Sequence, residues 1–215
     1  MASSARILGV LLAGGQARRM GGGDGRLVDK GRLDLGGQSL IAEVIARLAP
    51  QCGALILNAN GAQGRFADLC LPVVPDGIAG HPGPLAGILA GMEHAGAHGF
   101  THVLSAAADT PFLPRDLAPR LRHAAGVAQT PIALAATRAT GRLFAQPTFG
   151  LWPATLAPDL RAALMQGVSK VSAWAKEQGA ALEEFATEPF DPFFNVNTPE
   201  DLEQARAIWQ ALPRG

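Results

Sequence analysis

Short apolar runs alternate with segments of helical periodicity along the first half of this 215-residue chain. Apolar side chains recur at i, i+3, i+4 and i+7 from Ile41 to Leu48 and from Leu85 to Met92, which indicates two helices. Continuously apolar runs between such helices are typical of parallel strands that are covered on both faces. We therefore predict an α/β fold, a Rossmann-like and mostly parallel sheet between layers of helices. The predicted parallel strands are Ile7–Leu12, Ala54–Leu57, Leu71–Val74 and His102–Ser105.

The second half of the chain has a less regular pattern. A C-terminal helix is predicted after Thr198, because Thr198 can cap it, Pro199 suits its first position, and acidic residues follow. The expected buried stripe of this helix is Leu202, Ala205, Trp209 and Leu212. The other predicted elements are strands at Ile132–Ala136, Ala145–Leu151 and Ala181–Phe185, and helices at Leu156–Leu164 and Ser169–Lys176. The length suits one domain, residues 1–215.

The overall charge excludes some classes of partner. Eighteen basic residues balance eighteen acidic ones, which argues against general binding to nucleic acid or to a membrane surface. No apolar run reaches the 18 residues of a membrane span. Cys52 and Cys70 are isolated and have apolar neighbours, so we expect both to be buried, structural thiols in a reducing cytoplasm.

A loop rich in glycine and arginine follows the first predicted strand. It contains Gly14 and Gly15, then Arg18 and Arg19, then three further glycines. Glycines allow main-chain N–H groups to surround an anion, and arginine forks match phosphate oxygens. The spacing fits neither the dinucleotide fingerprint nor the P-loop. Because ligands bind at the carboxyl ends of strands in open α/β sheets, we predict a phosphate-binding loop rather than a plain surface loop.

Asp109 stands alone after the predicted strand His102–Ser105, among small residues and before Pro111. One carboxylate together with substrate phosphates and water is a usual environment for Mg²⁺. The alternative is that Asp109 caps a turn through its own backbone. We predict a metal site at Asp109.

Polar side chains also follow other predicted strands. Strand alternation would place Asn195 and Asn197 on one face, where their amides suit a metal–water shell or a phosphate, but taken alone the two asparagines favour a turn role. Asn58 and Asp76 follow the second and third predicted strands, where a base or a ribose could rest. The segment from Gly80 to Gly87 begins a helix whose N–H groups can face an anion.

Other residue types give weaker signals. His94 and His98 are four residues apart, but without the accompanying glutamate base of a zinc-protease motif we expect a solvated helix end. The serines lack the setting of an acyl-transfer nucleophile.

Taken together, these motifs resemble the molybdenum cofactor guanylyltransferases of the MobA type. These belong to the wider nucleotidyltransferases with a nucleotide-diphospho-sugar transferase-like fold. The resemblance runs from Ile7 to Leu212, and the proline–glycine loop with the NAN and NVNTPE motifs narrows it to the guanylyl branch. The motifs that carry it are Leu12-Ala13-Gly14-Gly15, Arg18-Arg19-Met20-Gly21-Gly22, Leu35-Gly36-Gly37-Gln38-Ser39-Leu40, Asn58-Ala59-Asn60, Pro82-Gly83-Pro84-Leu85-Ala86-Gly87, Asp109-Thr110-Pro111 and Asn195-Val196-Asn197-Thr198-Pro199-Glu200.

The resemblance implies transfer of GMP from GTP to the terminal phosphate of molybdenum-molybdopterin, with release of pyrophosphate. It implies that residues 1–112 bind the nucleotide and residues 113–215 the acceptor. Mg²⁺, or Mn²⁺ as an alternative, would be held by Asp109. The implied catalytic residues are Arg19, Lys30 and Asp109. The implied nucleotide-binding residues are Leu12, Ala13, Gly14, Gly15, Lys30, Asn58, Asp76 and Asp109. The implied acceptor-binding residues are Pro82, Gly83, Asn195 and Asn197.

This chain departs from the family pattern in the glycine loop. The family motif runs Met-Gly-Gly-x-Asp-Lys, whereas here Asp24 is followed by Gly25 and the nearest lysine, Lys30, comes five residues late. Gly25-Arg26-Leu27 recurs as Gly31-Arg32-Leu33, which indicates a five-residue insertion at Gly25–Asp29. Spacing downstream of Lys30 matches the family, so we assign the role of the family lysine to Lys30 rather than to Arg26.

The expected reaction needs no general base, because the attacking phosphate monoester is already an anion. Positioning and charge neutralisation are then the main requirements. Expected partners are GTP and molybdopterin, with transient contacts to proteins that supply molybdopterin and to molybdoenzymes that accept the product. Three alternatives stay open: a cytidylyltransferase of the same fold that acts on a pterin or other phosphate, a catalytically impaired GTP-binding module, and a molybdopterin chaperone.

Overall fold

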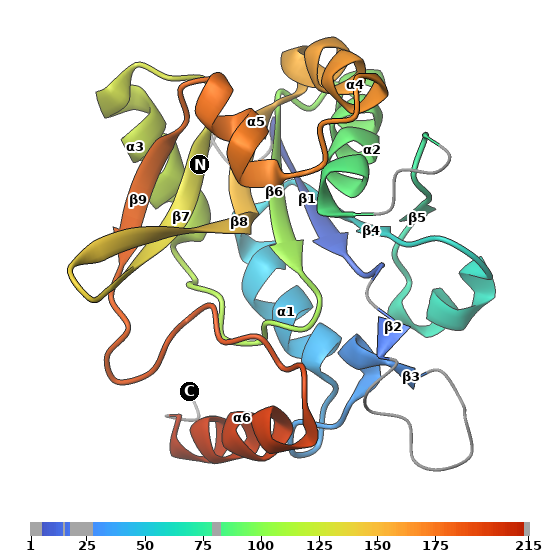
Figure 1. Cartoon of the computed structure of the whole chain (residues 1–215). Helices are drawn as coiled ribbons and strands as arrows, with labels where there is room; N and C mark the ends of the chain where they lie inside the picture. The colour runs from blue at the N-terminus through green and yellow to red at the C-terminus, as the bar shows by residue number, and fades with distance from the viewer. Residues whose placement is uncertain (1–5, 15, 18–27, 79–82, 213–215) are drawn as a thin grey trace.

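Seven strands form one mixed sheet in the order β5-β4-β1-β6-β8-β7-β9 (Figure 1). The computed structural model describes residues 6–14, 16–17, 28–78 and 83–212. β1, β4, β5 and β6 are mutually parallel, β8 is antiparallel to β6 and β7, and β9 is parallel to β7. The predicted α/β fold with a mostly parallel sheet is confirmed. The strand bounds are β1 Ile7–Leu12, β4 Ala54–Asn58, β5 Val73–Val74, β6 His102–Ala107, β7 Ala133–Ala139, β8 Arg142–Pro153 and β9 Ala181–Phe185.

Helices cover both faces of this sheet (Figure 1). α1 and α3 pack on one face, whereas α2, α4 and α5 pack on the other. The α-helices are α1 Leu40–Leu48, α2 Pro84–Ala97, α3 Leu117–Ala128, α4 Ala157–Met165, α5 Val171–Glu177 and α6 Pro199–Ala211. Short 3-10 helices are η2 Lys30–Arg32, η3 Ala49–Gln51, η4 Gln63–Leu69 and η5 Ala154–Leu156. No helix in the described ranges is long and apolar enough to cross a membrane.

Glycines allow α2 to lie close against the sheet. A Cβ on Gly91 would lie 2.5 Å from a methyl carbon of Val10 in β1, and a Cβ on Gly87 would lie 2.2 Å from the side-chain oxygen of Asn58. Both distances are far below ordinary van der Waals contact. α2 can therefore lie this close to β1 and to the last residue of β4 only because these two positions carry no side chain.

Several predicted boundaries need correction. β5 contains only Val73–Val74, whereas the predicted strand began at Leu71, and α5 begins at Val171 rather than at Ser169. β8 begins at Arg142, earlier than the predicted Ala145, because it forms a hairpin with β7.

The segment Asn195–Asn197 is not a strand. The Val196 N–H donates to the Asp109 carbonyl at 3.0 Å, and a single bond of this kind forms no ladder. The expected alternation of sides nevertheless holds, since Val196 is buried and the two asparagines are exposed.

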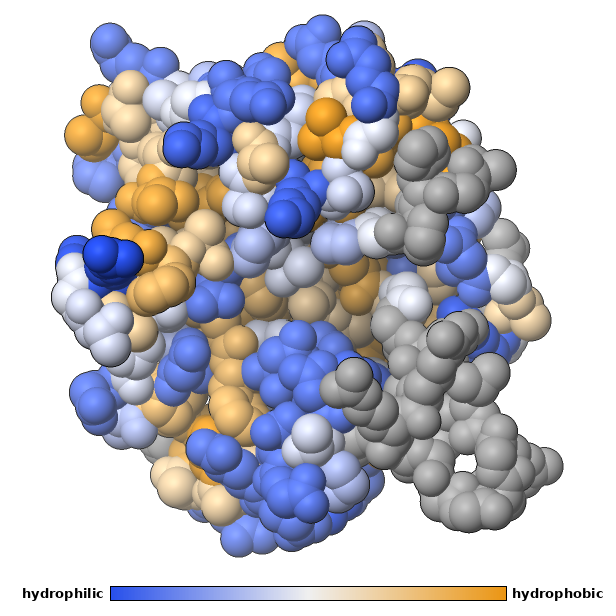
Figure 2. Space-filling model, in the orientation of Figure 1, coloured by the Kyte–Doolittle hydropathy of each residue, from blue (hydrophilic) through white to orange (hydrophobic). Residues whose placement is uncertain are grey.

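The C-terminal helix α6 begins as predicted, but only part of its apolar stripe is buried. Thr198 and Asp201 form a reciprocal capping box. Leu202 and Ala205 are buried, whereas Trp209 and Leu212 are half-buried, because the helix lies at the periphery of the molecule. Its outer surface is largely hydrophilic, at the bottom of Figure 2.

A third apolar cluster lies apart from the two main layers and fixes the ends of three separate segments. Leu35 and Leu40 come from around the start of α1, Phe112 from the loop after β6, and Val196 and Leu202 from the region that begins α6. All five side chains are at most 8% exposed. This cluster holds the segments that carry the candidate site at fixed positions relative to one another.

A two-stranded ribbon, which the sequence pattern did not predict, precedes η2. β2 (Gln16–Ala17) pairs with β3 (Val28–Asp29) in antiparallel register, with Gln16 opposite Asp29. Lys30 follows β3 directly. The ribbon therefore fixes the position of the backbone directly before Lys30. Most of the proposed insertion, residues 25–27, lies outside the described residues.

The two cysteines differ, which corrects the expectation that both are buried. Both are free; Cys52 is partly buried and Cys70 is exposed in a left-handed backbone conformation (φ 54°). Burial raises the pKa of the Cys52 thiol to about 12. Only the thiolate reacts with alkylating agents, so Cys52 should react more than about 10³ times more slowly at pH 8 than an ordinary thiol of pKa about 8.5. Peptide mass spectrometry after brief iodoacetamide treatment should find Cys70 labelled and Cys52 unlabelled; equal labelling would contradict this.

Candidate active site

Side chains from three distant segments meet beyond the carboxyl ends of β1 and β6. The Lys30 ammonium donates to the side-chain oxygen of Asn197 at 2.6 Å and lies 3.7 Å from a carboxylate oxygen of Asp109. Lys30 and Asp109 are 18% and 17% exposed, so the ion pair is largely shielded from water. The structure thus brings together three of the residues that the sequence singled out.

Lys30 owes its position to the short turn η2. The Leu33 N–H donates to the Lys30 carbonyl at 3.0 Å, and the Leu40 N–H donates to the Leu33 carbonyl at 3.0 Å. These bonds tie η2 to the first turn of α1, where the Ser39 hydroxyl caps the helix. The Lys30 side chain therefore extends from a backbone that hydrogen bonds hold in place, rather than from a free loop.

Asp109 lies two residues beyond the end of β6, in a largely buried position. Burial raises the pKa of the Asp109 carboxyl above its ordinary value, and the nearby Lys30 ammonium partly offsets that rise. A carboxylate desolvated in this way favours a cationic partner, and Lys30 is the partner in this structure.

Asn197 is placed by the N-terminus of α6. The Asp201 carboxylate accepts from the N–H groups of Asn197 and Thr198 at 2.8 and 2.9 Å, and the Asp201 N–H donates to the Thr198 hydroxyl at 3.1 Å. Because the cap fixes the backbone of Asn197, its side chain can reach Lys30 across 167 residues of sequence.

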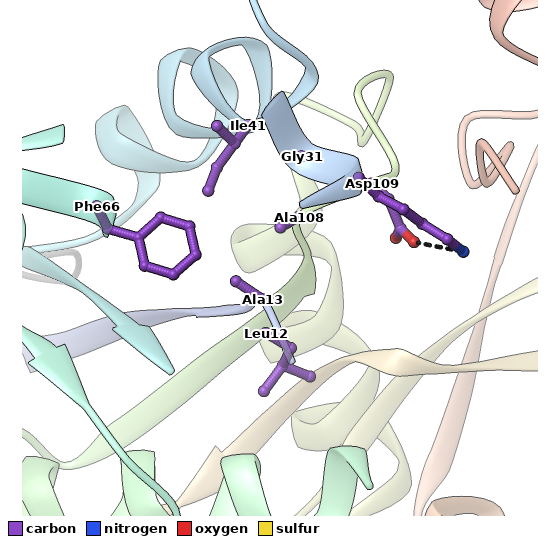
Figure 3. A pocket seen from close by; sticks show the side chains of 8 residues that line it. Leu12, Ala13, Gly31, Ile41, Phe66, Ala108 and Asp109 are labelled. Atoms are coloured by element: carbon purple, nitrogen blue, oxygen red, sulfur yellow. Dashed lines mark ion pairs between the residues drawn. The ribbon is translucent and has the colours of Figure 1, made fainter. Parts of the chain in front are cut away.

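A small pocket that opens to solvent adjoins this cluster (Figure 3). Leu12 and Ala13 continue β1 into it, and Figure 3 shows Asp109 on one side with its ion pair dashed and Phe66 on the other. Sequence reasoning missed Phe66 and Ile41. No local signal marks Phe66, which enters the pocket from η4. The full lining is Leu12, Ala13, Lys30, Gly31, Ile41, Phe66, Ala108 and Asp109.

A second polar cluster lies at the carboxyl ends of β4 and β5. Asn58 and Asn60 donate from their side-chain nitrogens to the two carboxylate oxygens of Asp76, at 2.9 and 2.7 Å. The Asp76 N–H donates in return to the Asn60 side-chain oxygen at 2.9 Å. Asn60, which the sequence analysis gave no binding role, thus holds Asp76 in place. The Ala13 N–H donates to the Asn58 carbonyl at 2.9 Å, which joins this cluster to the pocket.

The remaining predicted residues lie apart from these two clusters or outside the described residues. Gly14 is exposed beyond β1, Gly83 precedes α2 with φ 147°, and Asn195 is exposed. Gly15, Arg19 and Pro82 lie outside the described residues, as does the rival candidate Arg26. His94 and His98 stack at the end of α2 with ring centroids 4.0 Å apart, at the helix end that we expected.

The donor set near Asp109 suits a hard divalent cation. The Asp109 carboxylate and the Asn197 amide both offer oxygen, and both already face one positive charge, the Lys30 ammonium. Within residues 6–14, 16–17, 28–78 and 83–212, no group of three or more histidine, cysteine, aspartate or glutamate side chains forms a metal cage. The residues therefore fit a cation that keeps water and substrate oxygens as its other ligands, as Mg²⁺ commonly does.

A mixed Rossmann-like sheet with a lysine, a carboxylate and amides at its carboxyl edge has the groups that a nucleotidyltransferase needs to hold a nucleotide and its phosphates. A family model described as a MobA-like NTP transferase domain matches residues 9–181, and the chain belongs to this family. The resemblance inferred from the motifs is confirmed, and so is the enzyme class.

Two curated relatives are similar along nearly their whole length, and both are named molybdenum cofactor guanylyltransferase. The relative from Rhodopseudomonas palustris strain BisB5 is 49% identical over 202 residues, which cover 93% of this chain and 92% of the relative. The relative from Cereibacter sphaeroides is 45% identical over 204 residues, which cover 94% and 97%.

Solved structures share the fold at lower identity. Molybdopterin-guanine dinucleotide biosynthesis protein A from Archaeoglobus fulgidus matches with a TM-score of 0.69 at 23% identity, over 95% of this chain and 100% of that one. A 4-diphosphocytidyl-2C-methyl-D-erythritol synthase from Anaerococcus prevotii matches with a TM-score of 0.68 at 14% identity, over 95% and 98%. The fold alone therefore does not distinguish guanylyl from cytidylyl transfer.

Proposed function

We propose that this enzyme transfers GMP from GTP to the terminal phosphate of molybdenum-molybdopterin and releases pyrophosphate. The observation that carries the proposal is the 43–49% identity, over more than nine-tenths of the chain, to relatives named molybdenum cofactor guanylyltransferase. The site supports it, because its charges and pocket lie at the edge of the sheet where ligands bind in open α/β folds.

The chemistry asks for positioning and charge neutralisation more than for proton transfer. A phosphate monoester is anionic at neutral pH, so its attack on the α-phosphate of GTP needs no base. Lys30 would hold phosphate oxygens as negative charge develops, and the largely shielded setting of its ammonium strengthens that attraction. The backbone of Leu12, Ala13, Gly14 and Gly15 and the Arg19 side chain would complete the phosphate side of the site.

Asp109 would hold a divalent metal, Mg²⁺ or alternatively Mn²⁺, which when bound supplies positive charge to the phosphate oxygens of the substrate. Lys30 would then leave Asp109 and turn toward those oxygens, since its long side chain can rotate about several bonds.

The Asn58–Asn60–Asp76 cluster would hold the guanosine. A carboxylate oxygen has more than one lone pair, so Asp76 can accept from a guanine edge while it accepts from the asparagines. On the acceptor side, Pro82, Gly83, Asn195 and Asn197 would contact molybdopterin. Residues 1–112 would then bind mainly the nucleotide and residues 113–215 the acceptor.

We also propose a cytoplasmic setting and transient contacts with molybdopterin-supplying proteins and molybdoenzymes. The absence of a disulfide between the two cysteines of the chain supports a reducing compartment.

Pyrophosphate release measured with GTP and with CTP, each with Mg²⁺ and molybdopterin, tests the proposal. Release should require GTP and the pterin together. Release with CTP but not GTP would instead identify a cytidylyltransferase. GTP binding without release under any of these conditions would identify a GTP-binding module, and pterin binding without any effect of GTP would identify a chaperone.

Asp76→Asn should weaken the binding of GTP more than it slows the release of pyrophosphate. The substitution removes a charged acceptor for guanine N–H groups, and hydrogen bonds to charged groups contribute about 1.5–3 kcal/mol, so KM for GTP should rise roughly 10–100-fold. The kcat should change far less. Asp159→Asn, an exposed carboxylate in the first turn of α4, is the control. A fall in kcat with an unchanged KM would assign Asp76 to the phosphate side instead.

A further inference from the structure

Arg32 links the turn that carries Lys30 to a separate element of the fold. Its guanidinium pairs with both carboxylate oxygens of Asp68 and also donates to the Arg65 carbonyl at 2.6 Å. Asp68 and Arg65 belong to η4, which follows β4 and has no sequence proximity to η2. A guanidinium is rigid and planar, so bonds to two groups of one helix fix orientation as well as distance.

The same helix is joined to the cluster around Asp76. A terminal nitrogen of Arg65 donates to the Asn60 carbonyl at 3.0 Å, and the Asn60 side chain donates to Asp76 at 2.7 Å. Hydrogen bonds therefore run continuously from Asp76 through η4 to Arg32. Between these points, the Phe66 ring lies 5.4 Å from the Arg32 guanidinium carbon and 4.7 Å from that of Arg65, and this ring forms a wall of the pocket.

Arg32 stands two residues from Lys30 in a three-residue turn that the Leu33 N–H closes on the Lys30 carbonyl. A rotation of this turn would carry the Lys30 ammonium away from Asp109 and Asn197. The residues that line the pocket include Lys30 and Gly31 but not Arg32. Arg32 is therefore suited to act on the site through Lys30 rather than by touching a ligand.

We propose that Arg32 is a positioning residue, which clamps η2 onto η4 and so holds the Lys30 ammonium where it can reach the phosphates. The same hydrogen bonds connect the position of Lys30 to the cluster around Asp76. The proposal rests on the proposed function insofar as Lys30 is taken to serve nucleotide transfer. It adds a link between nucleotide-base recognition and phosphate chemistry that passes through Arg32, Arg65 and Asn60.

A double-mutant cycle with Lys30 tests this link. Arg32→Met should lower kcat/KM for GTP by at least about tenfold when Lys30 is present, because a misplaced catalytic group loses much of its effect. In a Lys30→Met background the same change should cost less than about twofold, because the effect that passes through Lys30 is already lost, and such non-additivity is the mark of coupled residues. Equal losses in both backgrounds would show that Arg32 does not act through Lys30 and would overturn the proposal.

Two variants separate geometry from charge. Arg32→Lys keeps the charge but loses the planar fork, so it should be nearly as impaired as Arg32→Met; wild-type activity in this variant would contradict a clamp. Arg138 is a matched control, since it pairs with both carboxylate oxygens of Glu184 and donates to the Gly141 carbonyl, far along the β7–β8 hairpin. Arg138→Met should leave turnover unchanged.

Hydrogen exchange keeps this test separate from that of the proposed function. The Leu33 amide closes η2, so Arg32→Met should speed its exchange at least about tenfold in the nucleotide-free protein, whereas Arg138→Met should not. Faster exchange without any wild-type turnover would leave the clamp supported and the proposed reaction wrong. Unchanged exchange in Arg32→Met would overturn the clamp whatever the reaction is.

Discussion

Asp109→Asn should lower GTP-dependent pyrophosphate release by about 10³-fold, because preorganised charge around a reacting phosphate contributes several kcal/mol. Asparagine keeps the shape of the side chain and removes its charge. Asp109 would lose both its proposed metal and its ion pair with Lys30, whereas the pocket wall would stay in place. Steady-state kinetics with saturating GTP, beside the Asp159→Asn control, measure the effect. Near-normal turnover would remove Asp109 from the mechanism.

Asp109→Asn should not lower the stability of the folded protein, and the direction of this effect follows from the pKa of Asp109. Burial raises this pKa in the folded protein, so above the unfolded value of about 3.9 the ionised carboxylate opposes folding rather than supporting it. This cost is present at neutral pH and disappears as the pH falls and the carboxyl takes up a proton in both states. The melting temperature of metal-free Asp109→Asn at pH 7.5 should therefore equal or exceed that of the wild type. A clear fall would mean that the pair with Lys30 outweighs the desolvation.

Lys30→Met should lower kcat for pyrophosphate release by about 10²–10³-fold, since it removes the one described ammonium group that lines the pocket. Methionine keeps the length and apolar stem of the side chain, so loss of charge is the main change. Lys176→Met on α5, whose side chain is exposed, is the matched control and should be unaffected.

The Lys30 variant also decides which residue replaces the family lysine. Arg26 lies in the inserted segment, outside the described residues, and Arg26→Met should have little effect if Lys30 has taken the role. A larger loss from Arg26→Met than from Lys30→Met would reverse the assignment. Measuring both variants at the same GTP concentrations makes the comparison direct.

Much of the fold could be predicted because its signals are local. The apolar runs at Ile7–Leu12 and Ala54–Leu57 and the periodicity from Ile41 to Leu48 show strands and helices without reference to the rest of the chain. The capping box at Thr198 is also local. Predictions failed where pairing with another segment sets the boundary, as at the start of β8, whose first residues are paired only through the hairpin with β7.

The candidate site could likewise be predicted only in part. Asp109, Asn58 and Asp76 could be singled out because each follows a predicted strand, and carboxyl ends of parallel strands meet at one edge of a sheet. Phe66 carried no such mark, because an apolar residue in a short 3-10 helix looks the same in sequence whether it lines a pocket or fills the core.

Short-range patterns and motifs were enough to identify the family, most of the strands and helices, and the residue types available for phosphate and metal chemistry, but they missed the β2–β3 ribbon and the helix α3. The contacts of Lys30 with Asn197 and Asp109, and the link that Arg32 makes between η2 and η4, are seen only in the folded chain. These contacts form across tens to hundreds of residues. They depend on the packing of Leu35, Phe112 and Val196 into one cluster, and side-chain packing is a property of the whole folded chain rather than of any segment.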